Sequence, residues 1–442
     1  MLSKTGISCI ISLLMQLIYN QLFAMKMVLV FSFIAILFYT CDKDDDIIPL
    51  PCVVDCDTSK LEVLWQEPLH IDSGAYGSFD PIVYQNNVLF SLIYYSDTEI
   101  LKMRDGKTGG IQWEWEPPFG KGYSSFSNAV FLKENKLIYC GENEVYSINM
   151  DDGKTNWAYD NQAGMCGWPR IKVWGDFVYH IHQPCGAADN IAYLVRTEID
   201  DGTEWDTIFT QLIKNGYSPG LELPDFWLNP QGDTILFFIN RMVNFSISSD
   251  TSNKVDLLAF NLTQRKLEYE IEEFDATGKA NFHPPLVWNN RIYVQGHHTI
   301  YCFDAASGQK LWASEYKGAG EHTSTGNLLI VNDKLVSYSN VGNFYVFDPW
   351  SGVEIRKVSD AGSNGPDMVA HEGIVYYGNI GDGRLHAIDV ETGKHIWRER
   401  SPNRKNGFPG ANFLHGVAIN PELGCLYTSD NHFAMCIKLP EK

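Results

Sequence analysis

The sequence predicts an all-β protein folded as an eight-bladed β-propeller of four-stranded antiparallel blades. Two observations predict this fold. A short sequence motif, which we call the phrase, recurs along the chain. It follows an alternating strand and consists of a turn rich in Asp and Gly and a second strand that carries Trp. Its complete copies are residues 105–113, 304–312 and 389–397. No long helical pattern is found after residue 40. Repetition at this spacing is typical of a ring of similar blades.

Degenerate copies of the phrase fill the intervals between the complete ones. Residues 149–157 keep the full spacing, and residues 201–205 are one residue shorter between Gly and Trp. Residues 261–269 end in Tyr, and residues 348–356 end in Arg. The anchors at the end of each phrase are therefore positions 113, 157, 205, 269, 312, 356 and 397, which lie 41 to 64 residues apart.

The two ends of the chain supply the halves of one further blade. Residues 61–65 resemble the strand after a turn, with Trp65 as an eighth anchor, but no strand precedes them. Residues 433–439 form a strand that no turn or Trp follows. We expect these two strands to pair and close the ring, because pairing removes two exposed strand edges.

The residue types of the phrase fit a tight turn at the seam between blades. Asp or Asn accepts hydrogen bonds from backbone N–H groups just ahead of it. Gly adopts positive φ without strain, and Trp covers a large apolar area. Before the turn, residues 344–347 show the period-2 alternation of a strand. The expected structural anchors are Trp65, Trp113, Trp157, Trp205, Trp312 and Trp397.

One copy carries a resemblance to a known family. Residues 387–397 resemble the Ala-x-Asp-x-x-Thr-Gly-x-x-x-Trp phrase of the PQQ-like repeat propellers, and the resemblance covers roughly residues 60–440. That family includes quinoprotein dehydrogenases, the BamB outer-membrane assembly lipoprotein and many binding proteins without known chemistry. The resemblance therefore implies a fold and leaves the function open.

The N-terminal segment predicts export and a lipid anchor. Residues 1–40 contain two bases and no acid, and the apolar run 28–39 ends just before Cys41. This arrangement resembles a bacterial lipoprotein signal. We expect a signal segment at 1–40, a tether at 41–59 and the propeller at 60–440, with lipid on Cys41. The alternative is an uncleaved membrane anchor.

The acidic residues behind Cys41 bear on localisation. Residues 43–46 read Lys-Asp-Asp-Asp, which resembles an export signal for surface lipoproteins; the alternative is a plain solvated linker. We expect an outer-membrane lipoprotein in the cell envelope of a Gram-negative bacterium, facing the periplasm or the surface. The formal net charge is −20, and removing Lys4 and Lys26 with residues 1–40 makes it −22. Nucleic acid is therefore not an expected partner.

Cysteines outside the cytoplasm permit disulfides. Cys425 and Cys436 flank a hairpin nearly symmetrically, and Cys166 and Cys185 fall within one blade, so both pairs are candidate disulfides. The alternative is that the cysteines are buried free thiols.

Blade geometry points to one face as the candidate binding surface. With four antiparallel strands in each blade, every segment that follows an anchor crosses the same face to reach the next inner strand, and loops on a rigid frame commonly carry binding. We name this side the loop face. The hypothesis is that its bases form a positive funnel toward the central channel for an anionic polymer, an acidic peptide or a protein partner. Ordinary solvated charges and aromatic residues of the core are the alternatives. The candidate residues are Lys121, Trp168, Lys214, Phe226, Lys279, His283, Lys317, Arg404 and Phe408.

No catalytic residue can be assigned from the sequence. The chain has no adjacent cysteine pair, no large insertion between repeats and no Gly-x-Ser-x-Gly elbow. His180 and His182 share a strand face, but no third metal ligand is identifiable. We expect no metal site and no cofactor, PQQ and calcium included. The predicted function is a non-catalytic, membrane-anchored scaffold that binds a protein or polymer. The alternatives are a PQQ-dependent dehydrogenase and a surface glycan-binding lipoprotein.

Overall fold

The computed structural model divides the chain into two units, residues 1–56 and residues 57–442, and every described residue belongs to the second unit. The predicted signal segment, Cys41 and nearly all of the predicted tether lie outside the described residues. The described ranges are 59–69, 75–76, 80–94, 99–118, 130–140, 144–160, 171–182, 191–202, 205–244, 253–278, 280, 283–316, 326–339, 341–362, 366–408 and 410–440.

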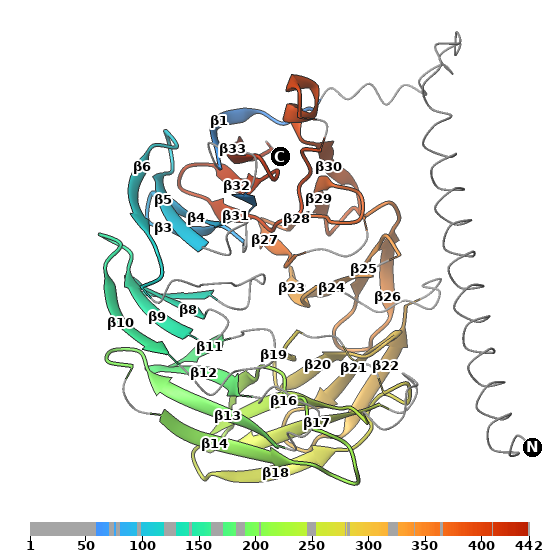
Figure 1. The fold of residues 1–442 in the computed structure, drawn as a ribbon. Coiled ribbons are helices and arrows are strands. Elements are labelled where there is room, and N and C mark those ends of the chain that lie inside the picture. Colours follow the sequence, from blue (N-terminus) through green and yellow to red (C-terminus); the bar gives the residue numbers. More distant parts are fainter. Residues whose placement is uncertain are drawn as a thin grey trace, which may run out of the picture. The chain divides into compact units, whose positions relative to one another are not determined.

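Eight antiparallel sheets form the blades of a closed ring, as the sequence predicts (Figure 1). Blade 1 holds β3 (Ile82–Tyr84), β4 (Asn87–Tyr94), β5 (Glu99–Asp105) and β6 (Ile111–Trp115), and β2 (Ala75–Tyr76) pairs with β4. Blade 2 holds β7 (Val130–Lys133), β8 (Lys136–Cys140), β9 (Glu144–Asn149) and β10 (Thr155–Asp160). Blade 3 holds β11 (Ile171–Trp174), β12 (Phe177–His182), β13 (Ile191–Glu198) and β14 (Trp205–Leu212). Blade 4 holds β15 (Asp225–Leu228), β16 (Thr234–Met242), β17 (Lys254–Asn261) and β18 (Lys266–Ile271).

The second half of the ring repeats this arrangement. Blade 5 holds β19 (Leu286–Trp288), β20 (Arg291–Gln295), β21 (Thr299–Asp304) and β22 (Lys310–Glu315). Blade 6 holds β23 (Leu329–Val331), β24 (Lys334–Ser339), β25 (Asn343–Phe347) and β26 (Glu354–Val358). Blade 7 holds β27 (Val369–His371), β28 (Ile374–Gly378), β29 (Arg384–Asp389) and β30 (His395–Arg400), and a 3₁₀ helix (Pro402–Asn406) follows it. No helix in the described ranges combines the length and the apolar character needed to span a bilayer.

Blade 8 contains both ends of the ring. It holds β31 (Ala418–Asn420), β32 (Cys425–Ser429), β33 (Phe433–Lys438) and, as its outer strand, β1 (Val63–Pro68). The pairing of β1 with β33 is antiparallel and places Trp65 opposite Cys436. The predicted closure of the ring by the two terminal strands is therefore confirmed.

Several anchor aromatics join their blade to the next by a hydrogen bond across the seam. The indole Nε1 of Trp65 in blade 8 donates to the carbonyl of Gly106 in blade 1 at 2.8 Å. The same bond runs from Trp113 to Met150 at 3.0 Å. The bond recurs from Trp157 to Ile199 and from Trp312 to Pro349. Trp65 and Trp397 are buried, and Trp113, Trp157 and Trp312 are partly buried; the side chain of Trp205 lies outside the described residues.

A glycine of the next blade lies directly under the rings of Trp65, Trp113, Trp157 and Trp312. Gly153 has φ +71°, and a Cβ on it would lie 2.7 Å from Trp113 Cδ2. Gly109 has φ +76° and stands in the same relation to Trp65. Glycine is required here twice over, because the backbone is left-handed and because the ring occupies the space of a side chain. The seam therefore depends on the Asp-Gly turn and the aromatic together.

We expect Gly153→Ala to lower the free energy of unfolding by about 2–4 kcal/mol, since it adds a left-handed alanine and a clash with Trp113. Gly175→Ala is the matched control, because Gly175 also has positive φ (+59°) but no atom lies within 4 Å of the position that its Cβ would take. It should lose only about 1 kcal/mol. Urea unfolding of the two variants measures the difference, and equal losses would contradict the seam contact.

Candidate binding face at the channel mouth

The inner strands converge at the centre of the ring, which in a β-propeller is the axis of a central channel. Each inner strand begins on the loop face, because four antiparallel strands return the chain to that face at the end of every blade. The neighbouring inner strands β31 and β3 are in contact, and so are β27 and β31 (Figure 1). Residues placed just before these strands therefore meet across the channel although they belong to different blades. We call this place the channel mouth.

Three titratable side chains come together at the channel mouth. Asp80 precedes β3, His283 precedes β19, and Asp367 precedes β27. The Nδ1 atom of His283 lies 3.3 Å from Oδ1 of Asp367, which joins blade 5 to blade 7 across blade 6. The Oδ1 atom of Asp80 accepts a hydrogen bond from the backbone N–H of Gly416 at 2.7 Å, which joins blade 1 to blade 8. We call these three residues the mouth cluster.

Asp80 is the residue whose acidity is most strongly changed. Burial raises the pKa of Asp80 from 3.8 to about 8, the Asp367 carboxylate raises it further, and the Gly416 hydrogen bond acts in the opposite direction. The carboxyl of Asp80 therefore holds a proton at neutral pH. Burial lowers the pKa of His415, just before β31, to about 4, so this imidazole is neutral at the same pH. Among the described residues, the Asp80 carboxyl can donate a hydrogen bond, and the Asp367 carboxylate can bind a cationic group.

The fit of Asp80 against blade 8 depends on a glycine. A Cβ added to Gly416 would lie 2.1 Å from Cγ of Asp80, so no other residue fits at position 416 without moving the carboxyl. Blades 6 and 7 are joined at the corresponding position, just before their inner strands. Asn327 accepts a hydrogen bond from the backbone N–H of Met368 at 2.8 Å and donates to its carbonyl at 3.1 Å. These bonds fix the positions of the inner strands that carry the mouth cluster.

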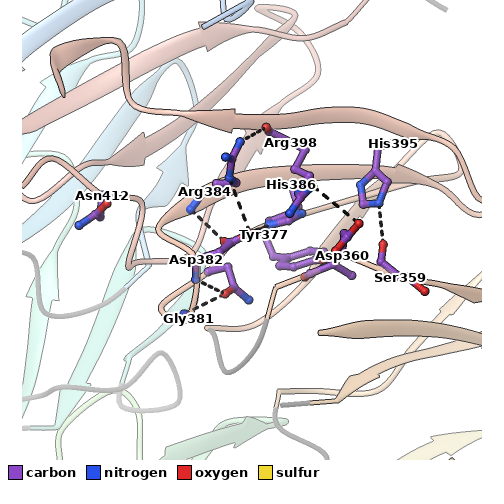
Figure 2. A network of polar contacts seen from close by, with 12 residues as sticks. Ser359, Asp360, Tyr377, Gly381, Asp382, Arg384, His386, His395, Arg398 and Asn412 are labelled. Carbon is purple, nitrogen blue, oxygen red and sulfur yellow. Dashed lines mark hydrogen bonds and ion pairs between the residues drawn. The ribbon is translucent and has the colours of Figure 1, made fainter. Parts of the chain in front are cut away.

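A second polar network stiffens the loop face beside blade 7 (Figure 2). Nε2 of His386 lies 3.1 Å from Oδ2 of Asp382 in the loop between β28 and β29. The imidazole stacks on the ring of Tyr377 with centroids 5.1 Å apart, and Tyr377 stacks on Tyr338 of blade 6 at 5.3 Å. The hydroxyl of Tyr377 donates to the carbonyl of Ala361 at 2.8 Å. Burial lowers the pKa of His386, while the contact with Asp382 opposes this change.

The same network reaches the outer strand of blade 7 and the crossing that follows blade 6. Arg384 donates from Nη1 to the carbonyl of Arg398 at 3.0 Å. Nε2 of His395 lies 3.0 Å from the carbonyl oxygen of Ser359, and Arg398 lies 3.9 Å from Asp360 (Figure 2). These contacts hold two loops of the loop face against each other. The network is therefore a rigid support beside the mouth cluster.

Lys214 lies away from the channel mouth and its charge is paired. Its Nζ is 2.7 Å from Oε1 of Glu272 and 3.1 Å from Oε1 of Glu270, at the end of the outer strand β18. The hydrogen bond with Glu272 is the main cause that raises the pKa of Lys214. Lys214 therefore adds no free positive charge to the hypothesised funnel, and the described groups at the mouth are carboxyls and histidines instead.

The other candidate residues have separate positions. Phe226 is buried and stacks on Trp174 with centroids 4.9 Å apart, so it belongs to the core between blades 3 and 4. Arg404 donates from Nη1 to Oδ1 of Asn412 at 2.7 Å, within the crossing from blade 7 to blade 8. Phe408 in the same crossing is 36% exposed and packs against Phe433. Four candidates lie outside the described residues: Lys121, Trp168, Lys279 and Lys317.

The candidate disulfide between Cys425 and Cys436 is not formed. Both are buried free thiols, and the strand register places Cys425 opposite Lys438 and Cys436 opposite Tyr427. The two cysteines are therefore diagonal neighbours on one face of the sheet and do not face each other directly. Cys166 and Cys185 lie outside the described residues.

Sequence reasoning missed the two carboxyls of the mouth cluster. Asp80 and Asp367 carry no motif, and their one signal is position, since each stands two residues before an inner strand. His283 is one of the candidate residues of the loop face, and its partner Asp367 is not. Within the described ranges no group of three or more His, Cys, Asp or Glu side chains is placed to hold a metal ion.

Asp80 makes stability depend on pH with a defined sign. Because its pKa is raised in the folded state, the folded protein binds this proton more tightly than the unfolded chain, and stability falls as pH rises from about 4 to about 8. We expect Asp80→Asn to become more stable than the wild type by about 1–3 kcal/mol at pH 9 and to show no such gain at pH 4. Thermal unfolding across this range measures it. Asp333→Asn, in an exposed turn, is the control, and parallel pH profiles for the wild type and Asp80→Asn would contradict the prediction.

Comparison with known proteins agrees with this architecture. Residues 251–358 match the family model described as outer membrane protein assembly factor BamB. No curated protein sequence matches the chain. The structure of BamB from Moraxella catarrhalis is similar with a TM-score of 0.57 and 12% identity, over 86% of this chain and 100% of that one.

Other solved structures share the fold. A europium-containing methanol dehydrogenase has a TM-score of 0.56 and 12% identity, over 85% of this chain and 86% of that one. Sqt1 from Saccharomyces cerevisiae has a TM-score of 0.57 and 11% identity, over 86% of this chain and 99% of that one. At such identities the likeness concerns fold and not activity. The chain is therefore an eight-bladed β-propeller, and its residues 251–358 are similar to the BamB family model.

Proposed function

We propose that the chain is a non-catalytic binding scaffold, tethered in the cell envelope of a Gram-negative bacterium by a lipid on Cys41, and that it engages a protein or polymer through its loop face. The observation that carries the proposal is the convergence of Asp80, His283 and Asp367 from three blades at the channel mouth. Similarity to an outer membrane protein assembly factor supports a scaffold role.

The loop face is the side on which we place the partner. Blade topology places the crossings between blades on this face, and the network around His386 holds two of its described loops in fixed positions. On the opposite side, which we call the turn face, the turn carboxylates are used internally. Asp105, for example, accepts hydrogen bonds from the backbone N–H and the hydroxyl of Thr108, and these bonds lower its pKa.

The chemistry of the mouth cluster favours a partner that inserts a polar group into the channel. A carboxyl that holds its proton donates a hydrogen bond, and the Asp367 carboxylate beside His283 accepts one. A protein loop with an amide or a basic side chain fits this pair. The loop-face lysines outside the described residues, Lys121, Lys279 and Lys317, remain candidate contacts for an anionic polymer or peptide.

Oxidation by a quinone-dependent mechanism is the second candidate, because a methanol dehydrogenase shares the fold and the mouth holds a pair of carboxyls. The residues do not favour it. The chain lacks the adjacent cysteines that the resemblance would imply, and the described residues present no metal-binding group of three or more donors. We derive no catalytic step from this pair of carboxyls.

A photo-crosslinking residue placed at Phe408 on the loop face should capture the partner in cells, whereas the same residue at Leu228, which is 57% exposed near the turn face, should not. Asp367→Asn combined with His283→Gln should weaken that capture about tenfold, because it removes the charge and the imidazole from the mouth. Immunoblotting of the crosslinked species measures both effects. Capture from Leu228 alone, or capture that the double variant leaves unchanged, would contradict the use of the loop face.

A further inference from the structure

A small polar pocket lies on the loop face, at the junction of blades 3 and 4. Its volume is about 60 Å³, which is room for about four groups the size of a water molecule. Its walls are the hairpin that follows β14, the end of β16, the start of β17 and the residues just after β18. The charged side chains that line it are Lys214, Lys254, Asp256, Glu272 and Glu273. We call this space the rim pocket.

The hairpin wall of the rim pocket is fixed by backbone hydrogen bonds. The N–H of Lys214 donates to the carbonyl of Tyr217 at 3.1 Å, and the N–H of Tyr217 donates back at 2.9 Å. The next residue, Ser218, exchanges two hydrogen bonds with Val243, at 2.9 and 3.0 Å, and so joins the hairpin to the residue after β16 in blade 4. A preformed pocket loses little conformational freedom when a ligand enters it.

Asp256 lines the rim pocket with one carboxylate oxygen that no donor uses. The residue is 0% exposed, and its Oδ1 accepts a hydrogen bond from the backbone N–H of Glu273 at 2.8 Å. Among the described residues, no N–H or O–H group donates to Oδ2. Burial is the main cause that raises the pKa of Asp256, and the Glu270 carboxylate adds to the rise. A buried polar atom of this kind calls for a partner with positive charge and a hydrogen to donate.

Both lysines of the rim pocket are already paired with carboxylates. Lys214 contacts Glu270 and Glu272, and Lys254 forms an ion pair with Glu273. Together with Asp256, four carboxylates therefore face two ammonium groups, which is a formal excess of two negative charges. This balance favours a cationic ligand and disfavours an anionic one.

A basic side chain fits this charge better than a metal ion does. In the part of the chain that the structure describes, no group of three or more His, Cys, Asp or Glu side chains is placed to hold a metal. A guanidinium or ammonium group carries one positive charge and several N–H donors, which form charge-assisted hydrogen bonds to carboxylates. The rim pocket therefore suits a cationic group of this kind.

The surface beside the rim pocket indicates that the cation belongs to a peptide. Leu212 and Ile213 come directly before Lys214 in the chain, and they are 59% and 42% exposed. Apolar residues that flank a basic residue can pack on this surface, whereas a free amine makes no use of it. We propose that the rim pocket binds a basic side chain of a peptide segment, with its cationic group against Asp256.

The rim pocket shares no residue with the mouth cluster. The double variant Asp367→Asn with His283→Gln should therefore bind a basic peptide as the wild type does. Loss of partner capture at the mouth and loss of peptide binding at the rim pocket are thus distinguishable, and either proposal can fail alone.

Titration calorimetry of the purified protein with the peptide acetyl-Ser-Leu-Arg-Leu-Ser-amide tests the proposal. We expect this peptide to bind, and the same peptide with citrulline in place of arginine to bind at least about tenfold more weakly, because citrulline keeps the shape and loses the charge. Asp256→Asn should weaken binding of the arginine peptide by a similar factor. This variant should fold, since asparagine has the same size and keeps an oxygen for the Glu273 N–H.

Glu272→Gln is a second test that does not depend on a buried position, because the Glu272 side chain is 65% exposed. It should also weaken binding. Glu315→Gln is the matched control, since Glu315 is an exposed carboxylate at the end of β22, the equivalent outer strand of blade 5, and it should leave the affinity unchanged. The proposal is overturned if the arginine peptide does not bind, if the citrulline peptide binds equally well, or if Asp256→Asn and Glu272→Gln bind as the wild type does.

Discussion

The structure depends on one recurring contact, in which an anchor side chain of an outer strand lies over a left-handed glycine in the next blade. The anchors that make it are Trp65, Trp113, Trp157, Tyr269, Trp312 and Arg356. Trp113 over Gly153 is the clearest case, because the ring fills the space that a Cβ would need and its N–H bonds the carbonyl of Met150. The contact fixes both the distance and the orientation between neighbouring blades. Since β1 and β33 close the ring, no seam can open without straining the others.

The same contact explains how much of the fold the sequence predicts. Where the anchor is Tyr269, its hydroxyl bonds the carbonyl of Ala305 and its ring covers Gly308. Where the anchor is Arg356, its methylene groups lie against Gly393 and its guanidinium bonds the carbonyl of Glu391. Spacing identified these positions although the residue type had changed. The period of the repeat, more than any single residue, carries the information about the fold.

The candidate site is much less visible in the sequence. Asp80 and Asp367 are far apart in the chain, and only closure of the ring brings their carboxyl groups close enough to interact. The charge of Lys214 is paired with Glu270 and Glu272, which lie at the end of β18 and follow no local spacing rule. Charge pairing depends on distances between loops, and repeat periodicity does not encode those distances. A count of bases on one face therefore predicts little about the potential at the channel.

The two faces of the ring therefore differ in the roles of their side chains. Turn residues such as Asp105 and Gly109 are used in the seams, and the side chains that the seams do not use are left for ligands. The mouth cluster stands out on the loop face for this reason. Each face is positioned by the same contact between blades.

A double-mutant cycle between Trp113 and Gly153 tests the central claim most directly. If the indole is what excludes a side chain at position 153, then Gly153→Ala should lose at least about 1 kcal/mol less in a Trp113→Ala background than in the wild type, as measured by urea unfolding. Strictly additive losses would show that the glycine serves its own turn and not the seam, and would contradict the account.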